Sequence, residues 1–274
     1  MNKAGDQLAD AERINEALVR VLAEGEVAIL ATLIEAPRYI GAKLLVHNSG
    51  AVTGSMNDRA LDEQIVRRAM KFIDSRIEAQ TLSVKEFASE LEAWRGARVL
   101  FERIEPEARV VVCGAGHVGA SLARLAHAIR YRVTLIDDRA DFVSRTRYPE
   151  TEIELVEARE GWARAVGAAV GTGRGVSVAV VTRGHNEDEE CLRAVVAARP
   201  DYVGMIGSRR RTNIVLERLR ETGVAEEILR QVRAPIGLDI GAVSPEEVAL
   251  AILAEIVAER RGGKGAPLSG WRRG

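Results

Sequence analysis

The sequence predicts an α/β protein. Its C-terminal part is expected to form a parallel sheet with helices on both faces, preceded by a smaller α+β domain. Two features support this prediction. From Arg109 onward, short apolar runs typical of buried strands alternate with runs of helical period. Before that point the pattern is mixed, and a charged, proline-containing stretch at 102–108 is expected to link the two parts.

The composition is that of a globular protein, with 47% hydrophobic and 29% charged residues in 274. The 39 basic and 40 acidic residues nearly balance and aromatic residues make up only 4%, which argues against a nucleic-acid partner. No apolar run approaches the roughly 20 residues of a membrane span. Two cysteines are too few for a disulfide framework. We therefore expect a cytoplasmic protein without a membrane partner.

The first domain is expected over residues 1–101 and contains four recognisable elements. Apolar residues at helical spacing predict a helix around 14–22, and 27–34 reads as a buried strand. Two extended runs on either side of Asn48-Ser49-Gly50 predict a hairpin. An amphipathic helix follows, with its apolar face formed by Leu61, Ile65, Ala69, Phe72 and Ile73.

The second domain is expected over residues 109–260. Its predicted strands are 110–113, 133–136, 152–156, 176–181 and 202–206. Its predicted helices are 118–130, 162–170, 188–198 and 211–221. A last helix is predicted from Ser244-Pro245-Glu246-Glu247, which combines an N-cap serine, a first-turn proline and a glutamate at the third position.

The body of this last helix, 248–257, is almost wholly apolar. We expect it to be buried against the sheet or against a second copy of the chain, so a homodimer is a possible assembly. The glycine-rich, basic segment 261–274 is expected to be a flexible tail.

The most informative motif is Gly114-Ala115-Gly116-His117-Val118-Gly119, which follows a predicted strand and opens a predicted helix. In this context the spacing predicts a Rossmann-like nucleotide cleft. Gly114 permits the tight turn, Gly116 lets a phosphate approach backbone N–H groups, and Gly119 lets the helix pack closely. Asp137, at the end of the next strand, can accept from sugar hydroxyls. The alternative is a loop kept for packing that binds no ligand.

Other candidates follow the remaining strands, because ligands in such sheets bind outside the carboxyl ends. Arg139 can contact a phosphate, and Thr182 and His185 are placed to face the cleft, with His185 a weak catalytic candidate. After the fifth strand, backbone N–H groups and arginines can bind an anion. The candidates there are Gly207, Ser208, Arg209 and Arg210.

Two further residues have both a functional and a structural interpretation. Asp239, in a glycine-punctuated loop, can line the site or satisfy backbone N–H groups of its own loop. Cys113 ends the first strand of the second domain and is a weak candidate for contact with a metal or sulfur. The structural alternative is a small buried residue. The sequence contains no zinc motif and no P-loop lysine motif.

Together these stretches resemble the XdhC/CoxI family of accessory proteins for molybdenum hydroxylases. The matching stretches are the glycine motif, Asp137-Asp138-Arg139 with Phe142, Thr182-Arg183-Gly184-His185, Tyr202 to Arg210, and Pro235 to Gly241 with Ser244-Pro245-Glu246-Glu247. In the first domain the resemblance rests on Ala36-Pro37-Arg38, Gly41-Ala42-Lys43 and Gly50. Where many members have a run of glycines, this chain has Gly54-Ser55-Met56-Asn57-Asp58.

The resemblance implies a chaperone that binds molybdenum cofactor, as molybdopterin or its dinucleotide, assists its sulfuration and inserts it into a hydroxylase such as xanthine dehydrogenase. A cysteine desulfurase would be a second partner, and net turnover would not be the protein's role. Two alternatives stay open. One is an NAD(P)-dependent oxidoreductase that uses the same cleft, and the other is a non-catalytic scaffold for a hydroxylase.

Overall fold

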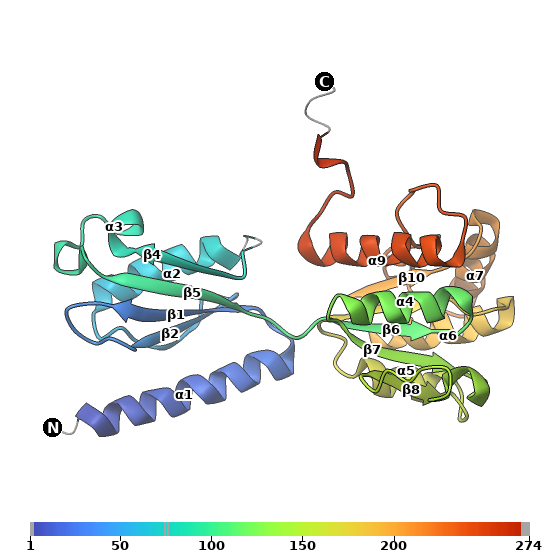
Figure 1. The fold of residues 1–274 in the computed structure, drawn as a ribbon, viewed down its shortest axis with the longest axis horizontal. Helices are drawn as coiled ribbons and strands as arrows, with labels where there is room; N and C mark the ends of the chain where they lie inside the picture. The colour runs from blue at the N-terminus through green and yellow to red at the C-terminus, as the bar shows by residue number, and fades with distance from the viewer. Residues whose placement is uncertain (1–2, 74, 76, 270–274) are drawn as a thin grey trace. The chain divides into compact units, whose positions relative to one another are not determined.

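The computed structural model describes residues 3–73, 75 and 77–269, and its fold is drawn in Figure 1. The chain divides into two compact units, with the boundary between Pro106 and Glu107. Within the described residues, each unit contains a five-stranded sheet and its own hydrophobic core. No helix in these ranges combines the length and apolar character needed to cross a bilayer.

The sheet of the N-terminal unit is antiparallel, with strand order β3-β2-β1-β5-β4. β1 (Ala28–Glu35) is central and pairs with β2 (Lys43–His47) and β5 (Arg98–Ile104). β3 (Val52–Gly54) and β4 (Ala79–Ser83) form the two edges. The first four residues of β1 are all buried, so both faces of the sheet are covered at its centre.

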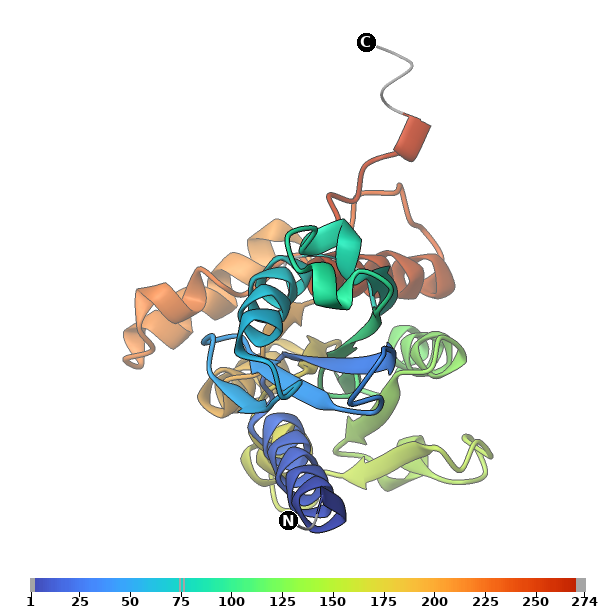
Figure 2. The same ribbon diagram turned by 90° about the vertical axis from the view of Figure 1, so that its left-hand side faces the viewer.

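Helices α1 (Lys3–Glu24) and α2 (Arg59–Ile73) lie on opposite faces of this sheet, as Figure 2 shows. α1 packs through Ile14, Ala17 and Val21 against one face. α2 packs through side chains four or three residues apart on the other face, namely Leu61, Ile65, Ala69 and Phe72. A short helix α3 (Val84–Phe87) and a 3-10 turn η1 (Glu92–Trp94) follow β4, and Trp94 completes this second core.

The N-terminal unit differs from the sequence prediction after α2. β4 and β5 were not expected, and β5 continues through Ile104, into the stretch predicted as a linker at 102–108. Two of the charged residues there, Arg103 and Glu105, are paired within the fold. Arg103 pairs with Glu105 at 2.8 Å and donates to the carbonyl oxygen of Ile73 at 2.6 Å. The charged end of an interior strand therefore resembles a linker in sequence, although it is paired with β1.

The sheet of the C-terminal unit is parallel, with strand order β10-β9-β6-β7-β8. Its strands are β6 (Arg109–Cys113), β7 (Arg132–Asp137), β8 (Ile153–Glu157), β9 (Val176–Val180) and β10 (Tyr202–Met205). The chain builds outward from β6 to β8, then returns to add β9 and β10 on the other side. The direction of winding therefore reverses between β6 and β9, where ligands of such sheets bind at the carboxyl end.

Helices cover both faces of this sheet, as predicted (Figure 1). α4 (His117–Ala128) and α9 (Pro245–Arg261) share a core with Val110 and Val112 of β6. The other core holds Val111 and Cys113 together with helix residues from the opposite face. The helices there are α5 (Trp162–Val170), α6 (His185–Ala198), α7 (Arg209–Glu221) and α8 (Glu226–Leu229). A 3-10 turn, η2 (Ala140–Val143), follows β7.

Helix α9 begins with the predicted capping box of Ser244 and Glu247 and with Pro245 in its first turn. Its apolar body is buried within the same chain, because it packs against α4 and the sheet. Leu250, on the outer side of the helix, is half exposed. Arg261 is the last residue of α9, and residues 270–274 of the predicted tail lie outside the described residues.

The segment after α8 extends the sheet along β10. The N–H of Arg233 donates to the carbonyl oxygen of Val203, and the N–H of Met205 donates to the carbonyl oxygen of Arg233, both at 2.9 Å. Gly204 makes room for this segment, because a Cβ there would lie 2.3 Å from Cδ1 of Ile236. The carboxylate of Glu255 on α9 accepts from the Tyr202 hydroxyl at 2.8 Å, and burial together with this bond raises the pKa of Tyr202.

Candidate functional site

The glycine loop, residues 114–119, joins β6 to α4 at the carboxyl end of the parallel sheet. Both neighbouring strands anchor it. The N–H of Gly114 donates to the carbonyl of Ile136 at 2.7 Å, and the N–H of Val181 donates to that of Cys113 at 2.8 Å. Gly116 is the N-cap of α4 and provides no side-chain cap. The first-turn N–H groups therefore face outward at the positive end of the helix dipole.

The three glycines of this loop have different surroundings. Gly114 has a φ of +112°, and a Cβ there would lie 2.6 Å from the carbonyl oxygen of Val181. A Cβ on Gly119 would lie 1.8 Å from the carbonyl oxygen of Gly114, so α4 packs directly on the loop. Around Gly116, no described atom lies within 4 Å of the Cβ position. The loop is thus closely packed at both ends and open in the middle.

Asp137 lies at the end of β7 with only 2% of its side chain exposed. Its Oδ2 accepts from the N–H of Ala115 at 2.7 Å and from Nη2 of Arg139 at 3.0 Å. Its Oδ1 accepts from the backbone N–H and the Nε of Arg139, at 3.0 and 2.8 Å. Burial opposes ionisation, but these donors outweigh it and lower the pKa of Asp137. We expected this carboxylate to accept from sugar hydroxyls, whereas here four donors already fill it.

Arg139 and the residues around it form one wall beside the loop. The Arg139 guanidinium lies 3.4 Å from the ring centroid of Phe142, in a cation–π contact. On the preceding residue, Asp138 pairs with Arg183 at 2.9 Å. β7 and β9 flank β6, so this ion pair joins the loops on either side of the glycine loop. The loop is therefore bordered by charged side chains that are already paired.

A buried network that the sequence did not reveal lies after β9. Asp188, in the first turn of α6, is fully buried and accepts hydrogen bonds from the Thr182 hydroxyl and from Nε of Arg211, the latter at 2.7 Å. We expected Thr182 to face the cleft. In the structure its hydroxyl binds Asp188, which joins α6 to α7 through Arg211. The only sequence signal for this network was an acidic residue in the first turn of one helix and an arginine in the first turn of the next.

Three consecutive arginines at the start of α7, Arg209 to Arg211, have different surroundings. Arg211 turns inward to Asp188, while Arg209 and Arg210 are exposed and, among the described residues, have no ion-pair partner. Ser208 is the N-cap of α7 and accepts from the N–H of Arg211 at 3.2 Å. Gly207 has a φ of +151° just before it. Two guanidinium groups without a partner in the described structure therefore remain beside a helix start at the carboxyl end of β10.

The remaining predicted residues are less closely connected to the loop. Asp239 is exposed, and no hydrogen bond or ion pair in the described structure joins it to the glycine loop. His117 is exposed in the first turn of α4. His185 opens α6, but its side chain lies outside the described structure.

Cys113 does not lie at the open surface of the loop. It is fully buried and packs in the core on the α5 and α6 face, beside Cys191. Its sulfur thus faces away from α4, as expected for the structural alternative of a small buried residue. Alternation along β6 explains this, since successive side chains point to opposite faces.

In the N-terminal unit, the segment Gly54-Ser55-Met56-Asn57-Asp58 is bound to its own domain. The Ser55 hydroxyl donates to Asp62 and the N–H of Met56 does the same, both at 2.7 Å. Asp58 accepts from the indole N–H of Trp94 at 3.0 Å, and this bond is the main cause of its lowered pKa. Asp58 also accepts from the N–H of Leu61 at 3.2 Å in the first turn of α2, so these bonds cap the helix and fix the segment.

Comparison with known protein families finds a match in each of the two units. A family model described as "XdhC Rossmann domain" matches residues 110–256, and one described as "XdhC and CoxI family" matches residues 21–84. The chain is 25% identical over 234 residues to "Uncharacterized protein YqeB" of Escherichia coli (strain K12), which covers 84% of this chain and 42% of that protein.

Two further relatives have descriptive names. A probable xanthine dehydrogenase subunit of Bacillus subtilis (strain 168) is 26% identical over 168 residues, which are 60% of this chain and 46% of that protein. "Molybdenum cofactor insertion chaperone PaoD" of E. coli (strain K12) is 23% identical over 282 residues, covering 88% of this chain and 86% of that protein. The chain therefore spans less than half the length of two of these three relatives.

Proposed function

This chain belongs to the XdhC and CoxI family, and on that premise we propose that it is a chaperone for molybdenum cofactor. In this role it binds the cofactor as cargo, protects it and passes it to a molybdenum hydroxylase of the xanthine dehydrogenase type. The names of two relatives, a cofactor insertion chaperone and a probable xanthine dehydrogenase subunit, support the cargo and the recipient.

The observation that carries this proposal is the open centre of the glycine loop. Molybdopterin carries a phosphate, or a nucleotide diphosphate in its dinucleotide form. The phosphate would lie at Gly116, where the Cβ position is empty and α4 offers uncapped N–H groups. Gly114 and Gly119 are closely packed against backbone atoms and therefore shape the loop instead of contacting the cargo.

The second anionic or polar part of the cargo would meet the arginines at the start of α7. Arg209 and Arg210 are exposed and are free of ion pairs within the described residues. Guanidinium groups bind oxyanions in a two-pronged way and stay charged at all physiological pH values. We propose that sulfuration of the bound cofactor by a cysteine desulfurase takes place while the chaperone holds it, with the desulfurase supplying the sulfur.

The oxidoreductase alternative is less well supported by the geometry. A nicotinamide cofactor usually places a ribose hydroxyl on the acid that follows the second strand. Here Asp137 already has four donors, two of them from the Arg139 guanidinium and one from the loop itself. Binding a ribose at this position would require the pair to break first.

Side-by-side binding distinguishes these functions. We expect the purified full-length chain, under anaerobic conditions, to retain molybdopterin-type cofactor on ultrafiltration and to show no saturable binding of NAD(H) or NADP(H). Tight nicotinamide binding without cofactor binding would contradict the chaperone proposal. Binding of neither would favour a scaffold that contacts a hydroxylase without carrying its cofactor.

A further inference from the structure

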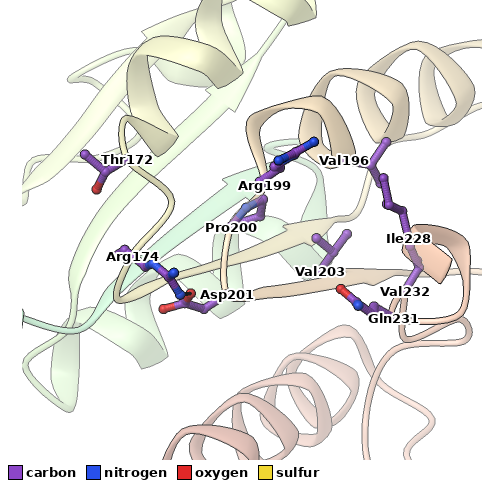
Figure 3. Close-up of a pocket in the computed structure, with 10 residues that line it drawn as sticks. All are labelled: Thr172, Arg174, Val196, Arg199, Pro200, Asp201, Val203, Ile228, Gln231 and Val232. Carbon is purple, nitrogen blue, oxygen red and sulfur yellow. Dashed lines mark hydrogen bonds and ion pairs between the residues drawn. The ribbon is translucent and has the colours of Figure 1, made fainter. Parts of the chain in front are cut away.

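The C-terminal unit contains a cavity of about 530 Å³ at the end of the sheet opposite to the glycine loop (Figure 3). Thr172 and Arg174, which precede β9, line it together with Arg199 and Asp201, which precede β10. It therefore opens at the amino-terminal ends of these parallel strands. We call it the amino-edge cavity. Its volume lies in the range of pockets that hold small organic ligands.

One wall of the amino-edge cavity is aliphatic. Four different segments contribute side chains to it, namely Val196 of α6, Val203 of β10, Ile228 of α8 and Val232 of the segment after α8. Val196 and Val232 are largely buried, with 6% and 8% exposed. The wall thus belongs to the domain core and offers a dry surface to an apolar group.

The charged side of the cavity has a cation that is unpaired in the described structure. Arg174 pairs with Asp201 at 3.3 Å, and Asp201 also accepts from the N–H of Gly175 at 2.7 Å. Arg199 is exposed and has neither an ion pair nor a side-chain hydrogen bond within the described part of the chain. In Figure 3 its side chain extends from beside Pro200 toward Val196. The lining therefore has a net charge of +1, from two arginines and one aspartate, which favours an anion.

The backbone that carries this cation is fixed by local contacts. Arg199 follows α6 directly as its C-cap, in the left-handed region, with φ 53° and ψ 53°, which is unusual for a residue with a side chain. Its carbonyl oxygen fits against Gly173, where a Cβ would lie 2.2 Å away. The N–H of Asp201 donates to Gly173 at 3.1 Å and fixes the same turn. The rim of the cavity is thus built from the turn before β9 and the turn before β10, which contact each other at Gly173.

From this combination we infer that the amino-edge cavity binds a small carboxylate with a short apolar chain. The apolar part would lie on the aliphatic wall, and the carboxylate would pair with the Arg199 guanidinium. The apolar wall lowers the local polarity and so strengthens this ion pair relative to one in bulk water. This site is independent of the glycine loop and of the cargo proposed for it.

The test uses three probes of equal length on the full chain: hexanoate, 1-hexanol and hexylamine. Amide chemical shifts followed by NMR report both the affinity and the position of binding. We expect hexanoate to bind about tenfold or more tightly than the other two and to shift the amides of Val203 and Val232. In Arg199→Gln, hexanoate should lose about tenfold in affinity, the value of one charge-assisted hydrogen bond, while hexanol is unchanged.

Two further variants serve as controls. Gln231→Trp, at an exposed position of the lining, should fill the cavity and block hexanoate without altering the fold. Arg230→Gln removes the same charge from a neighbouring exposed arginine outside the lining and should have no effect. Equal hexanoate affinity in wild type and Arg199→Gln, or shifts confined to other regions, would overturn the inference.

Discussion

Replacing Gly119 by alanine is expected to destabilise the C-terminal unit by about 3 kcal/mol or more, on the order of a severe overpacking defect. The added Cβ would lie 1.8 Å from the carbonyl oxygen of Gly114. The backbone fixes the position of a Cβ and the oxygen is itself a backbone atom, so neither can rotate away. Helix α4 would have to move off the loop. Hydrogen exchange of amides in β6 and α4 measures the loss in this unit alone, because a two-unit chain need not unfold in one step.

A glycine in another helix provides the matched control. Gly167, in α5, has no described atom within 4 Å of its Cβ position. Alanine there should stabilise the helix by up to about 1 kcal/mol, since alanine is the better helix former. The two substitutions are chemically identical. Stability changes of opposite sign would therefore identify close packing at Gly119 as the cause. A Gly119→Ala protein with unchanged exchange rates would contradict the packing that the structure shows.

Replacing Asp188 by alanine is expected to cost about 3 kcal/mol or more, as for other buried ion pairs that lose one partner. Asp188 is fully buried, and its loss would leave the Arg211 guanidinium and the Thr182 hydroxyl without their acceptor. The start of α7 and the loop after β9 would both loosen. The same exchange measurement, on amides of α6 and α7, gives the size and the location of the effect.

Glu189, the next residue of α6, is a suitable comparison. It pairs with Arg193 and Arg218 at the surface, and such pairs contribute about 0–1 kcal/mol. Glu189→Ala should therefore have a small effect. If the Asp188→Ala variant cost no more than the Glu189→Ala variant, the buried network would not hold α6 to α7. A smaller loss in the Asp188→Ala, Arg211→Ala double variant than in the sum of the single changes would confirm direct coupling.

Much of the C-terminal fold was predictable from sequence. Its central strands β6, β7 and β9 are largely apolar runs buried on both faces. The helices between the strands carry a clear apolar stripe, so period and length distinguish helices from strands. The N-terminal unit was harder to predict. β4 and β5 combine polar and charged residues with alternate apolar ones, and their pairing with distant segments, such as Glu102 opposite Leu30, leaves no local signal.

For the candidate site, the glycine loop and its neighbours could be placed from sequence, whereas side-chain partners could not. The spacing of Gly114, Gly116 and Gly119 indicated a strand-loop-helix connection, which the structure has. Asp137 accepts from Ala115 and Arg139, and these partners are set by side-chain geometry that exists only after folding. The same holds for Arg211, which turns inward while its two neighbours remain exposed.

The central claim is that the glycine loop holds the phosphate of the cargo, and Gly116→Val tests it most directly. The side chain would fill the open space at the start of α4, at a cost to the fold of up to about 1 kcal/mol. Equilibrium binding of molybdopterin-type cofactor to wild type and variant, under anaerobic conditions, should show about a tenfold or greater loss of affinity in a protein that remains folded. A folded Gly116→Val variant that binds the cofactor as tightly as wild type would contradict the claim.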